Sequence, residues 1–334
     1  MPECIAVLEQ AYQQLSDGEA IGAVSSEAVA PTAHPNGIYQ LKSMSGVMPS
    51  LGVSALRLSS DIIAFENKRQ FKLPLAPGNR YTGLILLFST ITGEPLAIFP
   101  DGILQRMRVG ATSALGAKYM ARRDSETVGL LGAGGQAGTQ VRAITSTHKI
   151  SSIRCYSPNQ QRCEAFCTAM SQEIGVPMHP VSSPELAVRK SDIVLCATNS
   201  SQNIFPADWH EPGMHVGTIR GAELSPDVMR RADLVAIHDR RLPGGAVATR
   251  GIKLPETWLA VAGMPELDQA PTLADLISGK AHGRRSPEEK SCFVNVIGMG
   301  LQFAAVGALF YRKVVEAGRG QKLPTEWLTE DVVP

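Results

Sequence analysis

The chain has 334 residues, and its 32 Lys and Arg against 31 Asp and Glu leave a formal net charge of +1. Charged residues amount to only 19% and hydrophobic residues to 44%, which excludes a disordered chain. Because there is no excess of basic residues, we expect neither nucleic acid nor a membrane surface as a partner.

The first third of the chain predicts an α+β unit, and the length allows about two domains. Residues 3–16 place apolar side chains at helical spacing, and residues 103–122 do the same. The strands expected between these helices are 38–41, 53–58, 83–88 and 96–99, the last two joined by a turn at 92–95.

In the middle of the chain, strands alternate with helices. The expected strands are 127–131, 152–156, 193–197, 214–217 and 234–237, and the expected helices are 136–147 and 160–175. This alternation indicates a parallel sheet with crossover connections. Residues 291–317 are apolar and predict one long helix or a broken pair of helices, ended by Gly318, Gly320 and Pro324.

The cysteine and histidine patterns favour neither a disulfide scaffold nor a metal site. The six cysteines contain no CxxC pair, and we expect small buried thiols, although Cys163 and Cys167 are four residues apart and could share a helix face. The remaining candidates, His34, His210 and His215, lack metal-ligand spacing. We therefore predict no metal.

Nothing in the sequence predicts a targeting or membrane segment. The N-terminus lacks the basic region of a signal peptide. No apolar run approaches the roughly eighteen residues that a membrane span needs. The expected location is the cytoplasm.

A glycine-rich turn follows the expected strand 127–131 and opens a helix. Gly132, Gly134 and Ala137 fit the pattern G-x-G-x-x-A, a variant of the dinucleotide fingerprint. The first glycine permits a tight turn, the second lets the backbone approach a pyrophosphate, and the alanine lets helix and strand pack closely. The strand and helix context favours a nucleotide-binding turn over a glycine loop without a cofactor.

The end of the next strand is where an acid would bind the ribose 2′-hydroxyl and repel a 2′-phosphate. Residues 154–162 contain no acid, and Ser157, Asn159 and Arg162 could tolerate or bind that phosphate. We therefore expect NADP or NAD as cofactor, leaning toward NADP. The alternative is that Arg162 merely solvates its helix.

Two further loops leave the carboxyl ends of parallel strands, where doubly wound sheets bind ligands. Thr198 follows the strand that ends at Ala197, and Gly217 ends the strand after it. We expect both loops beside the nicotinamide ribose.

Three stretches of the chain resemble the ornithine cyclodeaminase/mu-crystallin family. They are residues 92–115, with Arg106 and Arg108, the turn at 132–137, and residues 223–233. The resemblance implies a Rossmann-type doubly wound parallel sheet plus a second α+β domain. Residues 1–117 with 301–334 would form the substrate-binding and dimerisation domain, and residues 118–300 the dinucleotide-binding domain of a homodimer.

The resemblance also implies NAD(P)-dependent chemistry on amino and imino acids. Arg108 would bind the substrate carboxylate, unless it is a helix-surface arginine. Arg57 stands where the family usually has a lysine, and Lys42 could take over that lysine's role or be an exposed strand lysine. The expected cofactor contacts are Arg108, Thr112, Gly132, Gly134, Gly135, Gln136, Ala137, Ser157, Asn159, Arg162, Ala197, Thr198 and Gly217.

One departure from the family pattern bears on the reaction. Cyclodeaminases of the family carry an aspartate after the strand that ends near Gly217, but here residues 217–223 contain no aspartate. Ammonia loss and ring closure need that base, whereas hydride transfer to an imine does not. We therefore favour an imine reductase or amino-acid dehydrogenase that forms an amino acid from a small imino or keto acid. A cyclodeaminase and a non-catalytic, crystallin-like NADPH-binding protein are the alternatives.

Three smaller features complete the pattern. The pair His238 and Asp239 points its side chains apart on a strand, so a catalytic triad is not expected. The charged stretch 279–290 predicts an exposed loop, with phosphate binding as the alternative. Residues 298–302 open the last helix and either close over the nicotinamide or allow close helix packing through small residues.

Overall fold

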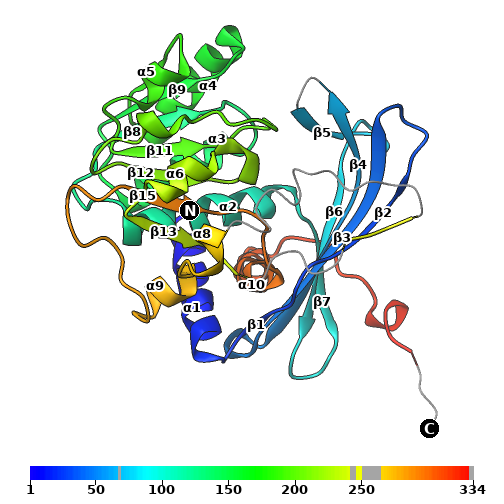
Figure 1. Cartoon of the computed structure of the whole chain (residues 1–334). Helices are drawn as coiled ribbons and strands as arrows, with labels where there is room; N and C mark the ends of the chain where they lie inside the picture. The colour runs from blue at the N-terminus through cyan, green and yellow to red at the C-terminus, as the bar shows by residue number, and fades with distance from the viewer. Residues whose placement is uncertain (67–68, 241–245, 250–264, 331–334) are drawn as a thin grey trace.

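The computed structural model describes residues 1–66, 69–240, 246–249 and 265–330, which form two sheets with helices around and between them (Figure 1). One sheet is parallel, with the strand order β10-β9-β8-β11-β12-β15-β13. The other has the order β14-β2-β3-β4-β6-β7, with β1 and β5 paired beside β3 and β4. The predicted α/β class, with a parallel sheet and an antiparallel sheet, is confirmed.

The parallel sheet consists of β8 (Thr127–Leu131), β9 (Ser152–Tyr156), β10 (Met178–Pro180), β11 (Ile193–Cys196), β12 (His215–Thr218), β13 (Leu234–Ile237) and β15 (Ser291–Val294). The helices between its strands are α3 (Ala137–Thr147), α4 (Gln160–Ile174), α5 (Pro184–Val188), α6 (Pro226–Arg230), α8 (Pro265–Asp268) and α9 (Leu273–Ile277). The chain runs from β8 outward to β9 and β10, then returns to place β11 on the other side of β8. The connections therefore diverge between β8 and β11, and at such a switch point the carboxyl ends of the strands leave a crevice.

The second sheet consists of β1 (Ile21–Gly22), β2 (Ser26–Pro31), β3 (Gly37–Met48), β4 (Val53–Glu66), β5 (Arg69–Leu73), β6 (Thr82–Ser89), β7 (Pro95–Pro100) and β14 (Ala246–Ala248). Its strands pair antiparallel, except that β14 runs parallel to β2. The predicted hairpin is present as β6 and β7. The strand β14 comes from the segment 118–300 but lies in this sheet.

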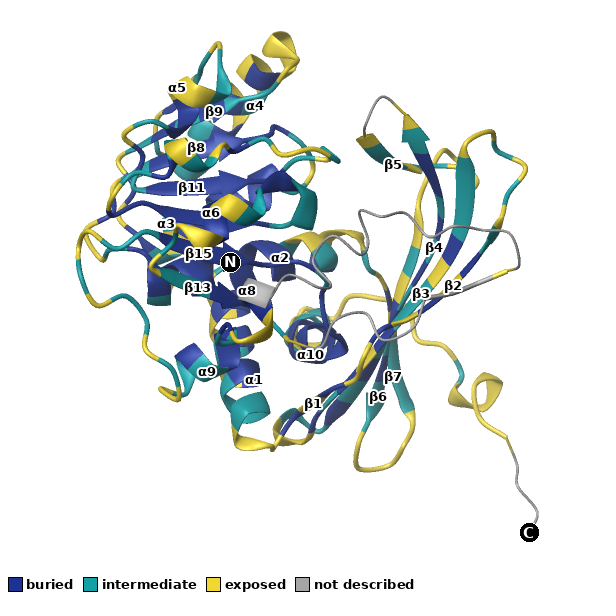
Figure 2. Ribbon diagram, in the orientation of Figure 1, coloured by how far each residue is buried: buried dark blue, intermediate teal, exposed yellow. Residues whose placement is uncertain are grey.

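Alternation along β4 gives this sheet two different faces. Every second residue from Val53 to Ile63 is buried, whereas Leu56, Leu58 and the other residues between them are only half-buried. Figure 2 shows buried and half-buried stretches together in the strands of this sheet. Because side chains of a strand alternate between faces, the buried Arg57 points to the inner face, opposite Leu56 and Leu58. The sheet therefore presents charged groups inward and leucines outward.

Three long helices join the two sheets: α1 (Pro2–Asp17), α2 (Gly102–Met120) and α10 (Gly300–Glu316). The helix α10 lies between the sheets and packs against β3 and β4 on one side and against α1 and α2 on the other (Figure 1). A side chain at Gly300 would meet the backbone of Ser45 at 2.0 Å, so close packing through small residues is what this helix start requires. Short 3₁₀ helices lie at Pro49–Leu51, Ala207–Trp209, Gly221–Glu223 and Thr325–Trp327.

The prediction of helix throughout residues 291–317 is wrong at its start. Residues Ser291–Val294 form β15, which pairs with β12 on one side and β13 on the other, and the helix α10 begins at Gly300. All four residues of β15 are buried. A short apolar run has no periodicity that separates a buried strand from a helix, and here the pairing on both sides decided the outcome. Among the described residues, no helix has both the length and the hydropathy to cross a bilayer.

Candidate active site

The glycine-rich turn lies at the switch point of the parallel sheet, between the end of β8 and the start of α3. Gly132 has φ +112, and a Cβ there would come within 2.4 Å of the Ala197 carbonyl oxygen. A Cβ on Gly134 would meet nothing within 4 Å, and one on Gly135 would lie 3.4 Å from Nη1 of Arg106. The turn thus needs glycine at its base and has open space above it. That space, with an arginine beside it, fits a pyrophosphate approaching the backbone.

The loop after β9 offers the polar groups expected near the ribose. Asn159 caps α4, because its side-chain oxygen accepts a hydrogen bond of 2.9 Å from the backbone N–H of Arg162. Arg162 is exposed and forms no ion pair with any residue that the structure describes. Ser157 is half-buried at the strand end. One of the three predicted ribose contacts is therefore engaged in capping, and the guanidinium is available for an anion.

A buried carboxylate ties the two loops that follow β11 and β12. Glu223 is fully buried and accepts five hydrogen bonds. The donors are the N–H and hydroxyl of Thr198, the hydroxyl of Thr218, and the N–H groups of Ile219 and Arg220, at 2.6–3.2 Å. Burial raises the pKa of Glu223, and these hydrogen bonds oppose that rise. The sequence marked Glu223 only as part of a motif, and its role as an organiser of both loops was missed.

A cavity of about 290 Å³ lies between these loops and the inner face of the antiparallel sheet. Its lining includes the three predicted cations Lys42, Arg57 and Arg108, together with Gln136 from the glycine-rich turn. Arg220 and Asn295 also line it. Residues predicted separately as substrate-binding and cofactor-binding therefore share one space.

Three lysine or arginine side chains of the cavity are already paired with carboxylates. Lys42 forms an ion pair with the buried Glu27, and Arg57 donates two hydrogen bonds to Asp101, at 2.7 and 2.9 Å. At the rim, Lys72 pairs with Asp61. These pairs neutralise Lys42, Arg57 and Lys72 within the protein itself.

Arg108 and Arg220 are different, since neither has a carboxylate within ion-pair distance among the described residues. Arg108 donates a hydrogen bond of 3.1 Å to the neutral amide of Gln302, and its guanidinium lies 5.3 Å from the ring centroid of Phe303. Burial, and then the neighbouring Arg57, lower the pKa of Arg108 to about 10. A buried guanidinium without a counter-ion is costly unless a ligand supplies one.

Unpartnered polar atoms are concentrated in this cavity. Four of the described buried side-chain atoms without a hydrogen-bond partner belong to its lining: Nε of Arg108, Nε of Arg220, Oε1 of Gln136 and Oδ1 of Asn295. Buried polar atoms in folded proteins are normally satisfied. The cluster therefore offers the unused donors and acceptors that a polar ligand needs.

The comparison with protein families fits this geometry. The model described as the ornithine cyclodeaminase/mu-crystallin family matches residues 2–318. The chain belongs to this family. A relative of the same family, a Delta(1)-pyrroline-2-carboxylate reductase of Bacillus cereus, is 27% identical over 284 residues, which cover 83% of each chain.

Solved structures support the fold of this ornithine cyclodeaminase/mu-crystallin member. Thermococcus litoralis Delta(1)-pyrroline-2-carboxylate reductase, in complex with NADH and L-proline, superposes with a TM-score of 0.77 at 22% identity, over 96% of this chain and 95% of that one. The iminosuccinate reductase of Paracoccus denitrificans, in complex with NAD+, gives 0.75 at 20% identity, over 96% and 94%. At these sequence identities, the two similarities show the fold of this chain and nothing further about it.

Of the predicted cofactor contacts, Arg108 and Gln136 line this cavity, whereas Thr112 and Gly217 are among those that do not. Thr112 is fully buried, donates to the carbonyl of Arg108 and accepts a hydrogen bond of 2.8 Å from Gln302. Gly217 lies inside β12, paired with Leu195 and Phe293 in the neighbouring strands. Thr112 thus contacts both Arg108 and Gln302. After β12, the cavity is lined by residues 219–222 and not by Gly217.

Long-range contacts that position Arg108 were missed by sequence reasoning. Gln302 also donates a hydrogen bond of 3.0 Å to the hydroxyl of Tyr12, which lies 3.4 Å from Nδ1 of His238. A Cβ on Gly298 would lie 2.3 Å from Nη1 of Arg108, so the arginine needs that glycine. Tyr12 lies in α1 and Gln302 in α10. His238 follows β13, and Gly298 precedes α10. No local signal in the sequence connects them to residue 108.

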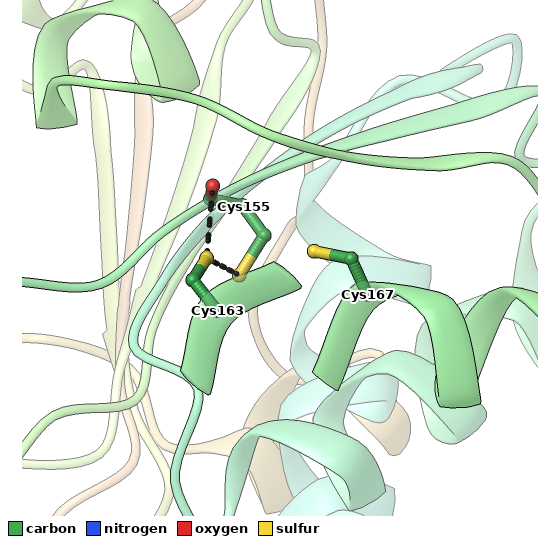
Figure 3. A group of neighbouring side chains, drawn as sticks. All are labelled: Cys155, Cys163 and Cys167. Atoms are coloured by element: carbon green, nitrogen blue, oxygen red, sulfur yellow. Dashed lines mark hydrogen bonds between the residues drawn. The ribbon is translucent and has the colours of Figure 1, made fainter. Parts of the chain in front are cut away.

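The cysteines are buried as predicted, and three of them form a group (Figure 3). Cys155 at the end of β9 faces Cys163 and Cys167 on α4, with all three Sγ atoms within 4.8 Å of one another. Cys163 donates to the carbonyl of Cys155 at 3.4 Å, and burial raises its pKa. A group of three thiols of this kind could hold a soft metal ion. Its members do not follow the CxxC spacing on which the prediction of no metal rested.

Proposed function

We propose that the chain is an NAD(P)H-dependent oxidoreductase that reduces a small imino acid or ketimine, or a keto acid plus amine, to an amino acid. The observation that carries the proposal is the unpaired, buried guanidinium of Arg108 in a cavity that it shares with the glycine-rich turn. An α-carboxylate is the anion that such an arginine binds bidentately. The relative that reduces Delta(1)-pyrroline-2-carboxylate, by its name, supports this class of substrate.

The residues of the cavity take different roles in the proposed reaction. Arg108 holds the α-carboxylate of the substrate. Arg57, neutralised by Asp101 and 5.7 Å from the same Phe303 ring, fixes the wall beside Arg108. Lys42 supplies the proton to the imine nitrogen, because burial lowers the pKa of its ammonium while Glu27 opposes that shift.

The cofactor supplies a hydride to the imine carbon when bound. Residues of the glycine-rich turn, with Arg106, would hold its pyrophosphate, and Thr198 would lie at its nicotinamide ribose. The hydride and one proton together convert the C=N bond to a CH–NH group, so the balance needs no other reactant. Arg162, without a carboxylate partner among the described residues, supports the leaning toward NADP.

A substrate panel tests this proposal. We expect absorbance of NADPH or NADH to fall when cyclic imino acids, or α-keto acids with ammonia or methylamine, are added. The cyclodeaminase alternative predicts ammonia release from ornithine or lysine with catalytic NAD. The position after β12, which would hold its base, carries Ile219 and Arg220 rather than an acid. Cofactor binding without turnover of any imine or diamino acid supports the crystallin-like alternative and contradicts ours.

We also propose that the chain forms a homodimer through the outer face of the antiparallel sheet. Leu41 is 40% exposed, Leu84 38% and Ile98 45%, and the strand pairing puts them on the same face as Leu56 and Leu58. A contiguous apolar sheet face is typical of a protein interface. Light scattering should give a dimer for the wild type and a monomer for Leu84→Glu. Leu186→Glu, at an exposed leucine of α5 beside the parallel sheet, is the control and should remain a dimer.

A further inference from the structure

Arg220 is, beside Arg108, a second arginine of the cavity that has no carboxylate partner among the described residues. It lies in the short loop after β12, where the sequence lacks the acid of cyclodeaminases. It lines the cavity, and its Nε is buried without a hydrogen-bond partner. One substrate carboxylate accounts for Arg108 alone, so Arg220 needs a separate explanation.

The surroundings of Arg220 do not neutralise it. Its Nη2 donates a hydrogen bond of 3.2 Å to the side-chain oxygen of Gln70, which is a neutral amide from β5. The nearby Glu223 directs its carboxylate oxygens to hydroxyl and backbone N–H donors, including the N–H of Arg220 itself. Burial lowers the pKa of Arg220, and Glu223 opposes that shift. Arg220 therefore resembles Arg108 and differs from Lys42 and Arg57, which carry their own carboxylates.

Its position suits a group on the side chain of the substrate. Arg108 comes from α2, and Gln70 and Arg220 come from β5 and the loop after β12, so the two guanidinium groups reach the cavity from different elements. Lys42, from β3, lines the same cavity. A substrate held by Arg108 at its α-carboxylate and protonated by Lys42 would extend its far end toward Arg220.

We propose that the substrate is a dicarboxylic imino acid, and that Arg220 binds the carboxylate at the end of its side chain. This inference rests on the proposed function, since it names the substrate class of the same site. A guanidinium forms two parallel hydrogen bonds to a carboxylate, and the free Nε with one terminal nitrogen provides such a pair of donors.

The first test compares substrates by kcat/KM. Pyruvate and 2-oxobutyrate with ammonia represent monocarboxylic imines, and oxaloacetate and 2-oxoglutarate with ammonia represent dicarboxylic ones. We expect the wild type to prefer a dicarboxylic substrate by about 10- to 100-fold, as one charged hydrogen-bond pair provides. Arg220→Gln should reduce that ratio to near one, mainly through KM, and Arg220→Lys should keep part of it. Arg230→Gln, at an exposed arginine of the same domain, is the matched control and should keep the ratio.

A binding test separates this inference from the proposed function. With NADP+ or NAD+ present, succinate should raise the melting temperature of the wild type more than propionate does, and Arg220→Gln should remove the difference. If no imine is reduced but this pattern holds, the proposed function fails and the anion site at Arg220 stands. A wild type that prefers monocarboxylic substrates overturns the inference and leaves the reductase function intact. An Arg220→Gln variant that weakens NADPH or NADH binding, with succinate and propionate unaffected, also overturns it, because Arg220 would then belong to the cofactor.

Discussion

The two sides of the cavity are built in different ways. On the side of the parallel sheet, the turn at Gly132 follows directly from residues adjacent in sequence, a strand, three glycines and a helix. On the side of the antiparallel sheet, the charges are set by contacts between distant residues, such as Arg57 with Asp101 and Arg108 with Gln302. The first side therefore depends on backbone geometry, and the second on ion pairs and hydrogen bonds between residues that are distant in sequence.

This difference shows how to interpret a cluster of cations. The sequence offered Lys42, Arg57 and Arg108 as candidates, with Arg108 as the first choice. In the fold, Arg108 is the one of these three that lacks a carboxylate partner among the described residues. Because an internal ion pair has already lost most of its attraction for a ligand, the unpaired arginine is the better candidate for binding. The same reasoning adds Arg220, which the sequence did not single out.

We expect the largest effect on activity from substitution of Arg108, the arginine without a carboxylate partner. We expect Arg108→Ala to lower kcat/KM by about 10²- to 10³-fold, because the substrate carboxylate loses a buried charged partner. Binding of NADPH or NADH, followed by fluorescence, should change little. Arg312→Ala, at an exposed arginine of α10, is the control and should keep full activity. Unchanged turnover in Arg108→Ala would remove the role that we assign to it.

On the parallel-sheet side, substitutions of Gly132 and Gly134 should distinguish an effect on stability from an effect on cofactor binding. Gly132→Ala forces a side chain into φ +112 and against the Ala197 carbonyl, so we expect about 2 kcal/mol or more of lost stability. Gly134→Ala meets open space, so stability should change by no more than about 0.5 kcal/mol, as for an ordinary surface site, while cofactor affinity falls about tenfold or more. Urea unfolding and fluorescence titration measure the two quantities. Gly102→Ala, with nothing within 4 Å at its Cβ, should alter neither.

Substitution of Glu223 tests how far the loops after β11 and β12 depend on the hydrogen bonds that its carboxylate accepts. Glu223→Gln replaces a carboxylate that accepts five hydrogen bonds by an amide whose NH₂ faces some of the same donors. We expect a loss of about 1–3 kcal/mol in the free energy of unfolding and a several-fold weaker binding of cofactor. Glu185→Gln, at an exposed carboxylate, should have almost no effect on either. Equal stability for both variants would mean that the loops hold their shape without Glu223.

The smallest effect concerns the pH dependence of stability on the parallel-sheet side. Burial lowers the pKa of His210 to about 4 and that of His215 well below its ordinary value of 6.5. Since the unfolded chain takes up these protons below about pH 6.5 and the folded one does not, stability should fall as the pH drops. At pH 5.5, His210 alone accounts for a loss of about 1 kcal/mol relative to pH 8. Urea unfolding at both pH values measures it, and His179→Asn, at an exposed histidine, should leave the pH dependence unchanged. Equal stability at pH 5.5 and pH 8 contradicts this assignment.

Local patterns predicted most of the secondary structure and failed where pairing decided it. The strand and helix around Gly132 begin and end close to the predicted residues, since alternation and glycine spacing are local properties. The strand β15 was missed, because its four residues are buried on every side and only β12 and β13 make them a strand. Gly217 lies one residue before the carboxyl end of β12, close to the predicted strand end, and its contact with the nicotinamide ribose stays a prediction.

The sequence by itself determined the family, the α/β class, the glycine-rich turn and the identity of three cations on the substrate side. Each of these depends on residue type and on the spacing of residues that are close in sequence, and neither requires knowledge of the folded structure. Only the tertiary structure decided which cations lack a carboxylate partner and can bind an anionic ligand. That depends on Glu27, Asp101 and Gln302, which lie 15, 44 and 194 residues from the side chains they contact. Electrostatic attraction depends on distance in space and on burial, and spacing along the chain specifies neither.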